Sequence, residues 1–158
     1  MQLTVVKYQP EYQPFFELFN KAWLEEYFTV EALDNMVLDN PQEMIINPGG
    51  DILFAADELG EILGTVALRV LEPGVYELTK MAVKKDLRGK GAGQFLCQAA
   101  IDRAIELGAN RLILYSNTIL ENAIFIYRKL GFKEIPLQNG VYGRANIMME
   151  YFLTVHPA

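Results

Sequence analysis

The sequence predicts a mixed α/β fold in which a single domain spans residues 1–158. A chain of 158 residues is about one domain's worth. Hydrophobic residues make up 51% and charged residues 22%, which is typical of a globular chain and not of a disordered one. Short apolar runs with strand character alternate with segments of helical periodicity, and no repeat or low-complexity linker interrupts them. The sequence therefore favours one core built from strands and helices.

The first half of the chain contains strand and helix signals in close succession. In chain order, the predicted elements are a strand over 3–8, a helix from Pro10 to Tyr27, a helix over 30–38, and two strands over 52–57 and 62–70. Proline fits the first turn of a helix because its missing N–H is not needed there. The segment 58–61, which contains Gly60, joins the two strands and is typical of a hairpin turn.

The second half begins with a longer strand and continues with helices and strands. The predicted elements are a strand over 75–83, a helix over 91–107, a strand over 111–115, a helix from Thr118 to Gly131, and strands over 133–135 and 145–153. Thr118 and Glu121 resemble a capping box, and Gly108 suits the end of the preceding helix. Regular alternation in the first of these strands predicts two faces, with Glu77, Thr79, Met81 and Val83 on one and Leu78, Lys80 and Ala82 on the other.

The composition excludes several kinds of chemistry. Cys97 and His156 are the only residues of their types. An internal disulfide, a Cys/His zinc site and a Ser-His-Asp hydrolase are therefore disfavoured, and we expect no metal site. The net charge of −6 opposes a nucleic-acid-binding face. The N-terminus lacks signal-peptide features and no apolar run approaches the roughly 18 residues that span a bilayer, so we expect a cytoplasmic protein without membrane contacts.

A positive segment interrupts this acidic chain. Residues 80–90 hold five basic residues and a single acidic one, Asp86. The segment Arg88–Gly93, which we call the glycine loop, lies between a predicted strand and a predicted helix. Backbone N–H groups and the helix dipole can converge on an anion at such a turn. A small anionic ligand is therefore one interpretation of this segment, and a solvated loop is the other.

Two better-known phosphate loops do not fit the glycine loop. A Rossmann fingerprint needs small residues where Gln94 or Leu96 stands. A Walker A loop needs Ser or Thr after its lysine, whereas Gly91 follows Lys90. A nucleotide-phosphate binder is therefore a weakened alternative.

Two motifs resemble the Gcn5-related N-acetyltransferase (GNAT) family. The glycine loop has the pattern R-x-x-G-x-G after Met-Ala-Val at 81–83, and residues 123–132 have the pattern A-I-x-x-Y-x-x-x-G-F. They occur in the family's order, with a helix and a strand between them. The resemblance is close over residues 50–135 and extends to the first fifty residues only by layout. It implies a GNAT-like single domain with a central mixed, mostly antiparallel sheet of about six to seven strands, flanked by about four helices.

The resemblance also implies that acetyl-CoA is the co-substrate and indicates the residues that bind it. These are Met81, Ala82, Val83, Arg88, Gly89, Lys90, Gly91, Ala92 and Gly93. In the family, backbone N–H groups beside the Met-Ala-Val strand pair with the pantetheine arm and polarise the thioester. Many members have an asparagine seven residues before the tyrosine, where this chain has Leu120. Asn117 and Asn122 are nearby substitutes, and each could instead cap the helix.

Two residues resemble the family's catalytic groups. Tyr127 resembles the general acid that protonates the departing thiolate, although its spacing from Ala123 and Leu130 also fits a core aromatic. Glu77, six residues before Val83, resembles the general base of the histone-acetylating branch, acting directly or through water, and a solvated carboxylate is the alternative. The implied function is transfer of an acetyl group to a primary amine by direct attack in a ternary complex. A catalytically silent CoA-binding or sensory module is the rival function.

Cys97 offers a different route, through an acetyl-cysteine intermediate. The residue lies mid-helix among apolar residues, with no nearby histidine to activate it. We therefore expect Cys97 to be a structural core residue.

The acceptor is expected to be a small-molecule or peptide amine that carries positive charge. The segment from Glu25 to Glu43 holds six acidic residues and no Lys or Arg, and the first two helices rim the acceptor site across the GNAT fold. Two further groups are candidates for contacts with the acceptor: Trp23, Tyr27 and Phe28 from the first helix, and Tyr142, Arg144 and Asn146 before the last strand. The identity of the amine and the oligomeric state, including a homodimer, stay open.

Overall fold

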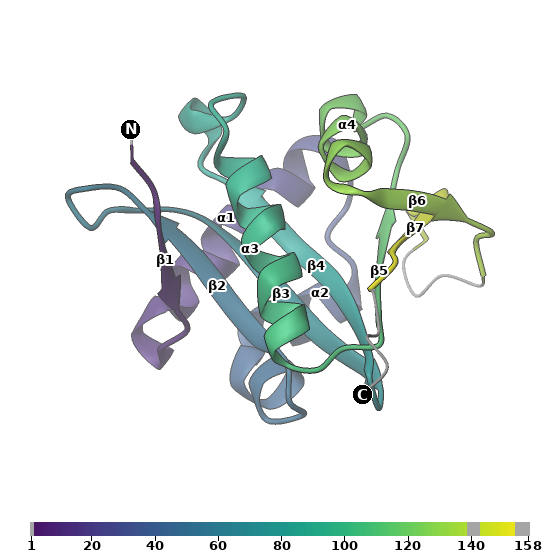
Figure 1. The fold of residues 1–158 in the computed structure, drawn as a ribbon. Helices are drawn as coiled ribbons and strands as arrows, with labels where there is room; N and C mark the ends of the chain where they lie inside the picture. Colours follow the sequence, from purple (N-terminus) through teal and green to yellow (C-terminus); the bar gives the residue numbers. More distant parts are fainter. Residues whose placement is uncertain (1, 139–142, 154–158) are drawn as a thin grey trace.

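The protein folds around a seven-stranded sheet with the strand order β1-β2-β3-β4-β5-β7-β6 (Figure 1). The structure is a computed structural model and describes residues 2–138 and 143–153. Its strands are β1 Thr4–Lys7, β2 Asp51–Ala56, β3 Ile62–Glu72, β4 Val75–Val83, β5 Arg111–Ser116, β6 Phe132–Ile135 and β7 Ile147–Tyr151. Its α-helices are α1 Gln13–Tyr27, α2 Ala32–Asp39, α3 Ala92–Glu106 and α4 Glu121–Leu130. All neighbouring strands are antiparallel except β4 and β5, so the predicted mixed, mostly antiparallel sheet is confirmed.

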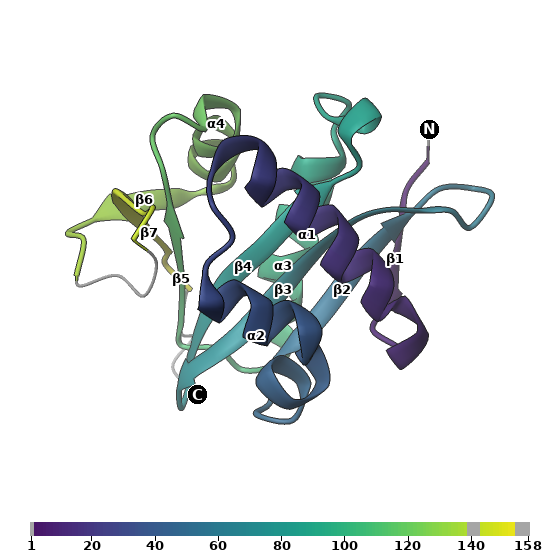
Figure 2. The same ribbon diagram turned by 180° about the vertical axis from the view of Figure 1, so that it is seen from behind.

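The helices cover both faces of the sheet. Helices α3 and α4 lie on the face toward the viewer in Figure 1, and α1 and α2 lie on the other, which Figure 2 shows from behind. Each face has its own core. Leu96 and Ala100 of α3 pack in the first core, and Phe16 of α1 and Val37 of α2 pack in the second. No helix in the described residues is long and apolar enough to cross a membrane.

The predicted hairpin and the third predicted strand are confirmed. β2 and β3 pair antiparallel around the turn that contains Gly60, and β4 has the predicted bounds, Val75–Val83. The capping box predicted at Thr118 is wrong. Helix α4 begins at Glu121 without a side-chain cap, because Thr118 bonds instead to Asn146, accepting from its Nδ2 at 3.1 Å and donating its own N–H to Oδ1 at 2.9 Å.

A bulge in β4 changes which way its side chains point. Thr65 of β3 pairs with Ala82 and Ala67 pairs with Thr79, so β4 has one extra residue between these pairs. Lys80 occupies the bulge with φ 54°, and it is the single non-glycine residue with positive φ in the described chain. Such a conformation is strained for lysine and costs about 1–2 kcal/mol. Contacts around Lys80 must therefore stabilise this backbone conformation.

The bulge overturns the predicted alternation along β4. Lys80 donates a hydrogen bond to Asp34 of α2, and the positive charge of Lys80 opposes the rise in pKa that burial causes at the Glu77 carboxyl. The side chains of Lys80 and Glu77 therefore face the α1–α2 side of the sheet. Met81 and Val83 instead pack with the core on the α3–α4 side. The prediction that Glu77 shares a face with Met81 and Val83 is wrong, because one extra residue exchanges the two faces of a strand.

Strands β4 and β5 separate after a short paired stretch. They are hydrogen-bonded in parallel register over Val75–Glu77 and Arg111–Ile113, whereas β4 continues to Val83. On its other side β5 pairs with β7. The second half of β4 therefore presents a sheet edge to an opening within the sheet, and backbone groups on such an edge can bond to a ligand.

Candidate active site

A cavity of about 580 Å³ occupies the split between β4 and β5. Its walls come from α1, the second half of β4, the glycine loop, the end of β5, the start of α4 and the segment before β7. Most of the predicted site residues line it: Met81, Ala82, Val83, Arg88, Gly89, Gly91, Gly93, Asn117, Asn122 and Tyr127. Lys90, Ala92 and Glu77 are not among its lining residues. The tertiary structure thus brings together two motifs that are separated by 29 residues in the sequence.

The glycine loop leaves the N-terminus of α3 open. Gly89 and Gly91 have φ angles of 77° and 90°, and a Cβ at either position would meet nothing within 4 Å. Gly91 is the N-cap residue, and it caps α3 without a side-chain hydrogen bond. The first N–H groups of a helix have no partner within the helix. These groups and the helix dipole suit a phosphate group, so the loop fits the pyrophosphate of a CoA-type ligand.

Arg88, the first residue of the glycine loop, anchors it to neighbouring elements. Ala92, the first residue of α3, has a buried side chain, whereas Lys90 is exposed. Arg88 donates from Nη1 to Oε2 of Glu26 at 2.6 Å, and its guanidinium lies 6.0 Å from the Tyr27 ring centroid. Its Nε also donates to the Val83 carbonyl oxygen at 3.4 Å. Arg88 therefore connects the end of β4 to the end of α1.

Tyr127 brings a buried phenol to the cavity wall. Its ring packs edge-on against Phe132 at a centroid distance of 5.8 Å. Burial, together with the neighbouring Cys97, raises the Tyr127 pKa, so the phenol keeps its proton at neutral pH. Cys97 is fully buried, and burial raises the pKa of its thiol to about 12. A protonated, inaccessible thiol is a poor nucleophile.

Glu77 lies behind the cavity wall. Its side chain is 1% exposed, and burial raises its pKa despite the charges of Arg69, Lys80 and Arg144. Arg69 Nη1 lies 3.5 Å from Glu77 Oε1. Glu77 is outside the lining residues, so its carboxylate does not border the cavity directly.

Charged side chains from three distant segments meet beside the α1–α2 end of the cavity. This charged cluster consists of Glu31, Asp34, Lys80 and Arg144. Asp34 is fully buried and accepts from Lys80 Nζ at 2.6 Å and from Arg144 Nη1 and Nη2 at 2.8 Å each. Arg144 Nη1 also donates to Glu31 at 2.7 Å. Burial opposes ionisation of Asp34, but hydrogen bonds from Arg144 and Lys80 lower its pKa to about 2.

The charged cluster changes the interpretation of the acidic segment 25–43. Glu26, Glu31 and Asp34 are paired with Arg88, Arg144 and Lys80, and Asp39 reaches Lys21 at 3.4 Å. Four of the six carboxylates therefore serve ion pairs within the protein. Sequence reasoning assigned Lys80 to a positive segment and to one face of a strand, and Asp34 to an acidic segment. No local signal pairs them, because 46 residues separate them.

A model described as the Acetyltransferase (GNAT) family matches residues 11–132, which is most of the chain. An uncharacterized N-acetyltransferase of Schizosaccharomyces pombe is 30% identical over 139 residues, covering 82% of this chain and 85% of that protein. The chain belongs to the GNAT family of acetyltransferases. An L-methionine sulfoximine/L-methionine sulfone acetyltransferase of Pseudomonas aeruginosa is 33% identical over 104 residues, or 61% of this chain and 60% of that one.

Solved GNAT structures have the same fold. An acetyltransferase of the GNAT family from Staphylococcus aureus has a TM-score of 0.82 at 22% identity, covering 94% of this chain and 98% of that chain. The Salmonella typhimurium acetyltransferase yncA, solved with its cofactor acetyl-CoA, has a TM-score of 0.75 at 21% identity, covering 100% and 98%. At these identities the likeness concerns the fold, and it confirms the predicted GNAT architecture.

The asparagines of this GNAT chain occupy different positions in the site. Asn117 donates from Nδ2 to the Arg144 carbonyl oxygen at 2.7 Å and accepts from the Ile119 N–H at 3.0 Å. It therefore braces the turn before α4 against the charged cluster. Asn122 lies exposed on the first turn of α4 and lines the cavity. Tyr142, the remaining candidate before β7, lies outside the described residues.

Proposed function

We propose that this GNAT enzyme transfers an acetyl group from acetyl-CoA to a cationic primary amine, on a small molecule or a peptide, by direct attack in a ternary complex. One observation carries the proposal: the open N-terminus of α3, the free edge of β4 and Tyr127 all face one cavity. An anion cradle, a set of backbone hydrogen-bonding groups and a proton donor are the three parts that this transfer needs.

The residues of the glycine loop would hold the pyrophosphate of acetyl-CoA. The N–H groups at the start of α3 supply donors there, and Arg88 and Lys90 add positive charge. Backbone groups of Met81–Val83 on the edge of β4 that faces the cavity would hold the pantetheine arm. Asn117 and Asn122 also line the cavity and would add a polar contact. Acetyl-CoA supplies an activated acyl group as a thioester.

The reaction forms a bond between the acceptor nitrogen and the acetyl carbon and breaks the bond between that carbon and the CoA sulfur. Starting from its ammonium form, the nitrogen loses two protons, one before the attack and one as the amide forms, while the sulfur gains one and the other passes to solvent. The transfer therefore needs no oxidant or reductant. Tyr127 is suited to donate the proton to sulfur, because burial keeps its phenol protonated. Glu77 is suited to accept the nitrogen's proton through water, because burial raises its pKa.

Two features favour a positively charged acceptor: the net negative charge of the protein and the aromatic side chains that line the cavity. The net charge is −6, and an amine of ordinary pKa near 10 arrives as an ammonium ion. Ring faces such as those of Trp23 and Tyr27, which line the cavity, attract ammonium groups. Exposed carboxylates contribute less than the sequence suggested, because Glu26 and Glu31 form ion pairs within the protein.

Release of free CoA thiol from acetyl-CoA, measured with a panel of amines, tests the proposal. We expect thiol release that depends on an amine, and an acetylated amine with the expected gain of mass. Tight binding of CoA without thiol release from any amine would instead favour the silent CoA-binding module. Thiol release that requires Cys97, lost in Cys97→Ala, would contradict direct attack.

A further inference from the structure

Elements from both faces of the sheet line the cavity. The glycine loop lines it where α3 begins, and α1 lines it from the opposite face of the sheet, which we call its α1 end. If acetyl-CoA occupies the glycine loop, as the proposed function requires, the acceptor must approach from the α1 end. The side chains there determine which amine fits.

Three aromatic side chains form the wall at the α1 end. Trp23, Tyr27 and Phe28, which we call the acceptor wall, all line the cavity. The Trp23 ring lies 5.7 Å from the Tyr27 ring and 5.8 Å from the Phe28 ring, centroid to centroid. Tyr27 ends α1, and the Phe28 N–H bonds back to the Leu24 carbonyl oxygen at 2.6 Å, so the helix end holds the wall in place. Trp23 also packs against the second core.

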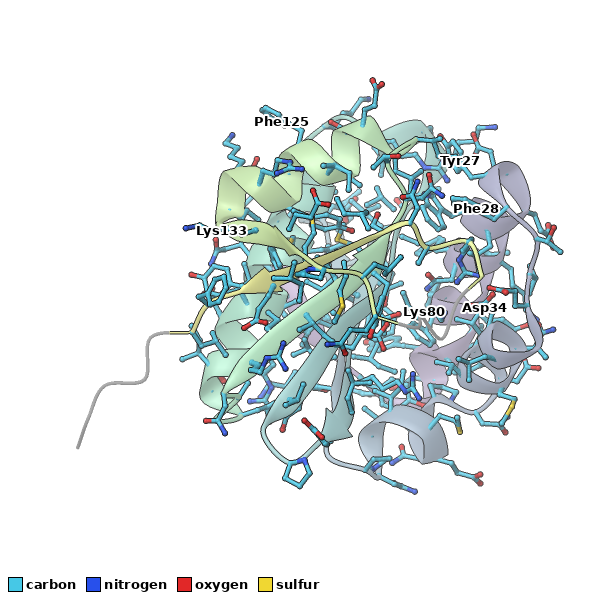
Figure 3. The ribbon with its side chains drawn as sticks, turned by 90° about the vertical axis from the view of Figure 1, so that its right-hand side faces the viewer. Tyr27, Phe28, Asp34, Lys80, Phe125 and Lys133 are labelled. Carbon is cyan, nitrogen blue, oxygen red and sulfur yellow. The ribbon has the colours of Figure 1, made fainter. Side chains whose placement is uncertain are left out.

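Further apolar side chains face the acceptor wall from α4 and the turn before it. Ile119 and Phe125 line the cavity and are 64% and 63% exposed. In Figure 3, Phe125 lies on α4, and Tyr27 and Phe28 lie across from it at the same end of the molecule. Large apolar side chains gathered around one opening are typical of a binding site for an apolar group.

The charged groups beside this wall balance one another. In Figure 3, Lys80 and Asp34 lie below the aromatic side chains. The charged cluster contains two carboxylates, Glu31 and Asp34, and two cations, Lys80 and Arg144, joined by hydrogen bonds of 2.6–2.8 Å. A second charge on the acceptor would therefore compete with these bonds, and breaking a buried ion pair is unfavourable because it leaves a charge without its partner. Neither a carboxylate nor a second ammonium group is favoured here.

We propose that the acceptor is a primary amine carried on an aromatic or similarly bulky apolar body, without a second charged group. The acceptor wall packs against the ring, and the amine points into the split between β4 and β5, where the acetyl group is delivered. This inference rests on the proposed function and adds the substrate class.

A matched set of amines tests it by turnover. 2-Phenylethylamine has the ring, ethylamine lacks it, phenylalanine adds a carboxylate and 1,4-diaminobutane replaces the ring with a second ammonium group. We expect kcat/KM for 2-phenylethylamine to exceed that of each other amine by about tenfold or more, since one well-packed ring contact is worth roughly that factor. A higher kcat/KM for phenylalanine, for 1,4-diaminobutane or for ethylamine would overturn the proposal and leave acetyl transfer itself intact.

Binding provides a readout that does not need catalysis. Trp23 is the only tryptophan of the chain and lies in the acceptor wall, so tryptophan fluorescence reports on this site alone. With CoA present, 2-phenylethylamine should change the fluorescence saturably, and at lower concentrations than the other three amines. Saturable binding without any turnover would contradict the proposed function but support the acceptor class. Turnover of another amine, with no saturable signal from 2-phenylethylamine, would contradict the acceptor class only.

Two variants test whether the acceptor wall causes the preference for 2-phenylethylamine. Phe28→Ala removes a ring of the acceptor wall, and Phe15→Ala removes a partly exposed ring of α1 that does not line the cavity. We expect Phe28→Ala to raise KM for 2-phenylethylamine about tenfold, with KM for ethylamine and for acetyl-CoA unchanged. Phe15→Ala should leave all three KM values unchanged. Equal effects of the two variants, or an equal effect of Phe28→Ala on both amines, would overturn the proposal.

Discussion

The glycine loop and the charged cluster both border one cavity, the cluster through Lys80 and Arg144, and they differ in how many parts of the chain they need. The glycine loop is one continuous segment whose backbone N–H groups do the binding, at the start of α3. The charged cluster joins side chains from α2, β4 and the segment before β7, across separations of up to 113 residues. A site made of local backbone keeps its function through many side-chain changes, whereas a site made of distant charges fails when one charge is lost.

The largest expected effect concerns Tyr127, at the cofactor end. Tyr127→Phe removes the phenol hydroxyl and retains the packed ring, so kcat should fall roughly 10²- to 10⁴-fold with little change in CoA affinity. Steady-state kinetics with CoA binding measured separately checks this. Tyr151→Phe is the matched control, because Tyr151 also packs on Phe132, at 5.6 Å, but does not line the cavity. An unchanged kcat, with chemistry rate-limiting, would assign Tyr127 to the core alone.

The second effect tests whether the charged cluster depends on each member. Asp34→Asn leaves Lys80 and Arg144 without a buried counter-charge, so the free energy of unfolding should fall by about 3–5 kcal/mol. Asp39→Asn changes an exposed carboxylate on the same helix and should cost less than about 1 kcal/mol. Urea unfolding of both variants makes the comparison. Equal small losses would mean that the charged cluster does not hold the bulge of β4.

The Asp34 carboxylate also predicts a pH dependence of stability. Its pKa is lowered to about 2 in the folded protein from an ordinary value of 3.8. Because the folded pKa is the lower one, the stability from Asp34 is present above pH 4 and is lost as the pH falls toward 2. Urea unfolding at several pH values should show this fall in wild type and a smaller fall in Asp34→Asn. Identical pH profiles would show that other groups determine acid unfolding.

The third variant tests the glycine loop. Gly91→Glu places a side chain and a negative charge at a φ of 90°, in the space proposed for the pyrophosphate. CoA affinity should fall at least about 100-fold, which calorimetric titration can measure. Gly60→Glu is the matched control, since Gly60 has φ 81° and equally open surroundings in a hairpin turn outside the cavity. It should share the backbone strain and keep CoA affinity, whereas equal losses would remove the anion site from the loop.

The smallest effect concerns the contact between the glycine loop and α1. Glu26 holds Arg88, so Glu26→Gln should release this guanidinium and tighten CoA binding about two- to fivefold, the range expected for an exposed ion pair. The gain should shrink with added salt, since exposed charges are screened. Glu25→Gln removes the neighbouring exposed charge and controls for net charge. Equal gains from both variants would show that Arg88 is not restrained by Glu26.

The sequence by itself determined the features that arise from neighbouring residues. The bounds of β4, the hairpin around Gly60 and the glycine loop before α3 all depend on residues within a few positions of one another. Glycine at 89 and 91 permits positive φ, and the change from strand to helix periodicity places the loop at a helix N-terminus. These local constraints were sufficient to predict the fold class and the family, and most of the predicted site residues do line the cavity.

Only the tertiary structure decided how the side chains of β4, α2 and the segment before β7 meet. The bulge at Lys80 exchanged the predicted faces of β4, and Asn146 took the Thr118 hydroxyl away from its expected role as a cap. Asp34, in an apparently solvent-exposed acidic segment, proved to be buried between Lys80 and Arg144. A pattern of charges along the chain specifies no partner, because the energy of a buried ion pair depends on distance and burial, and the folded chain alone sets both.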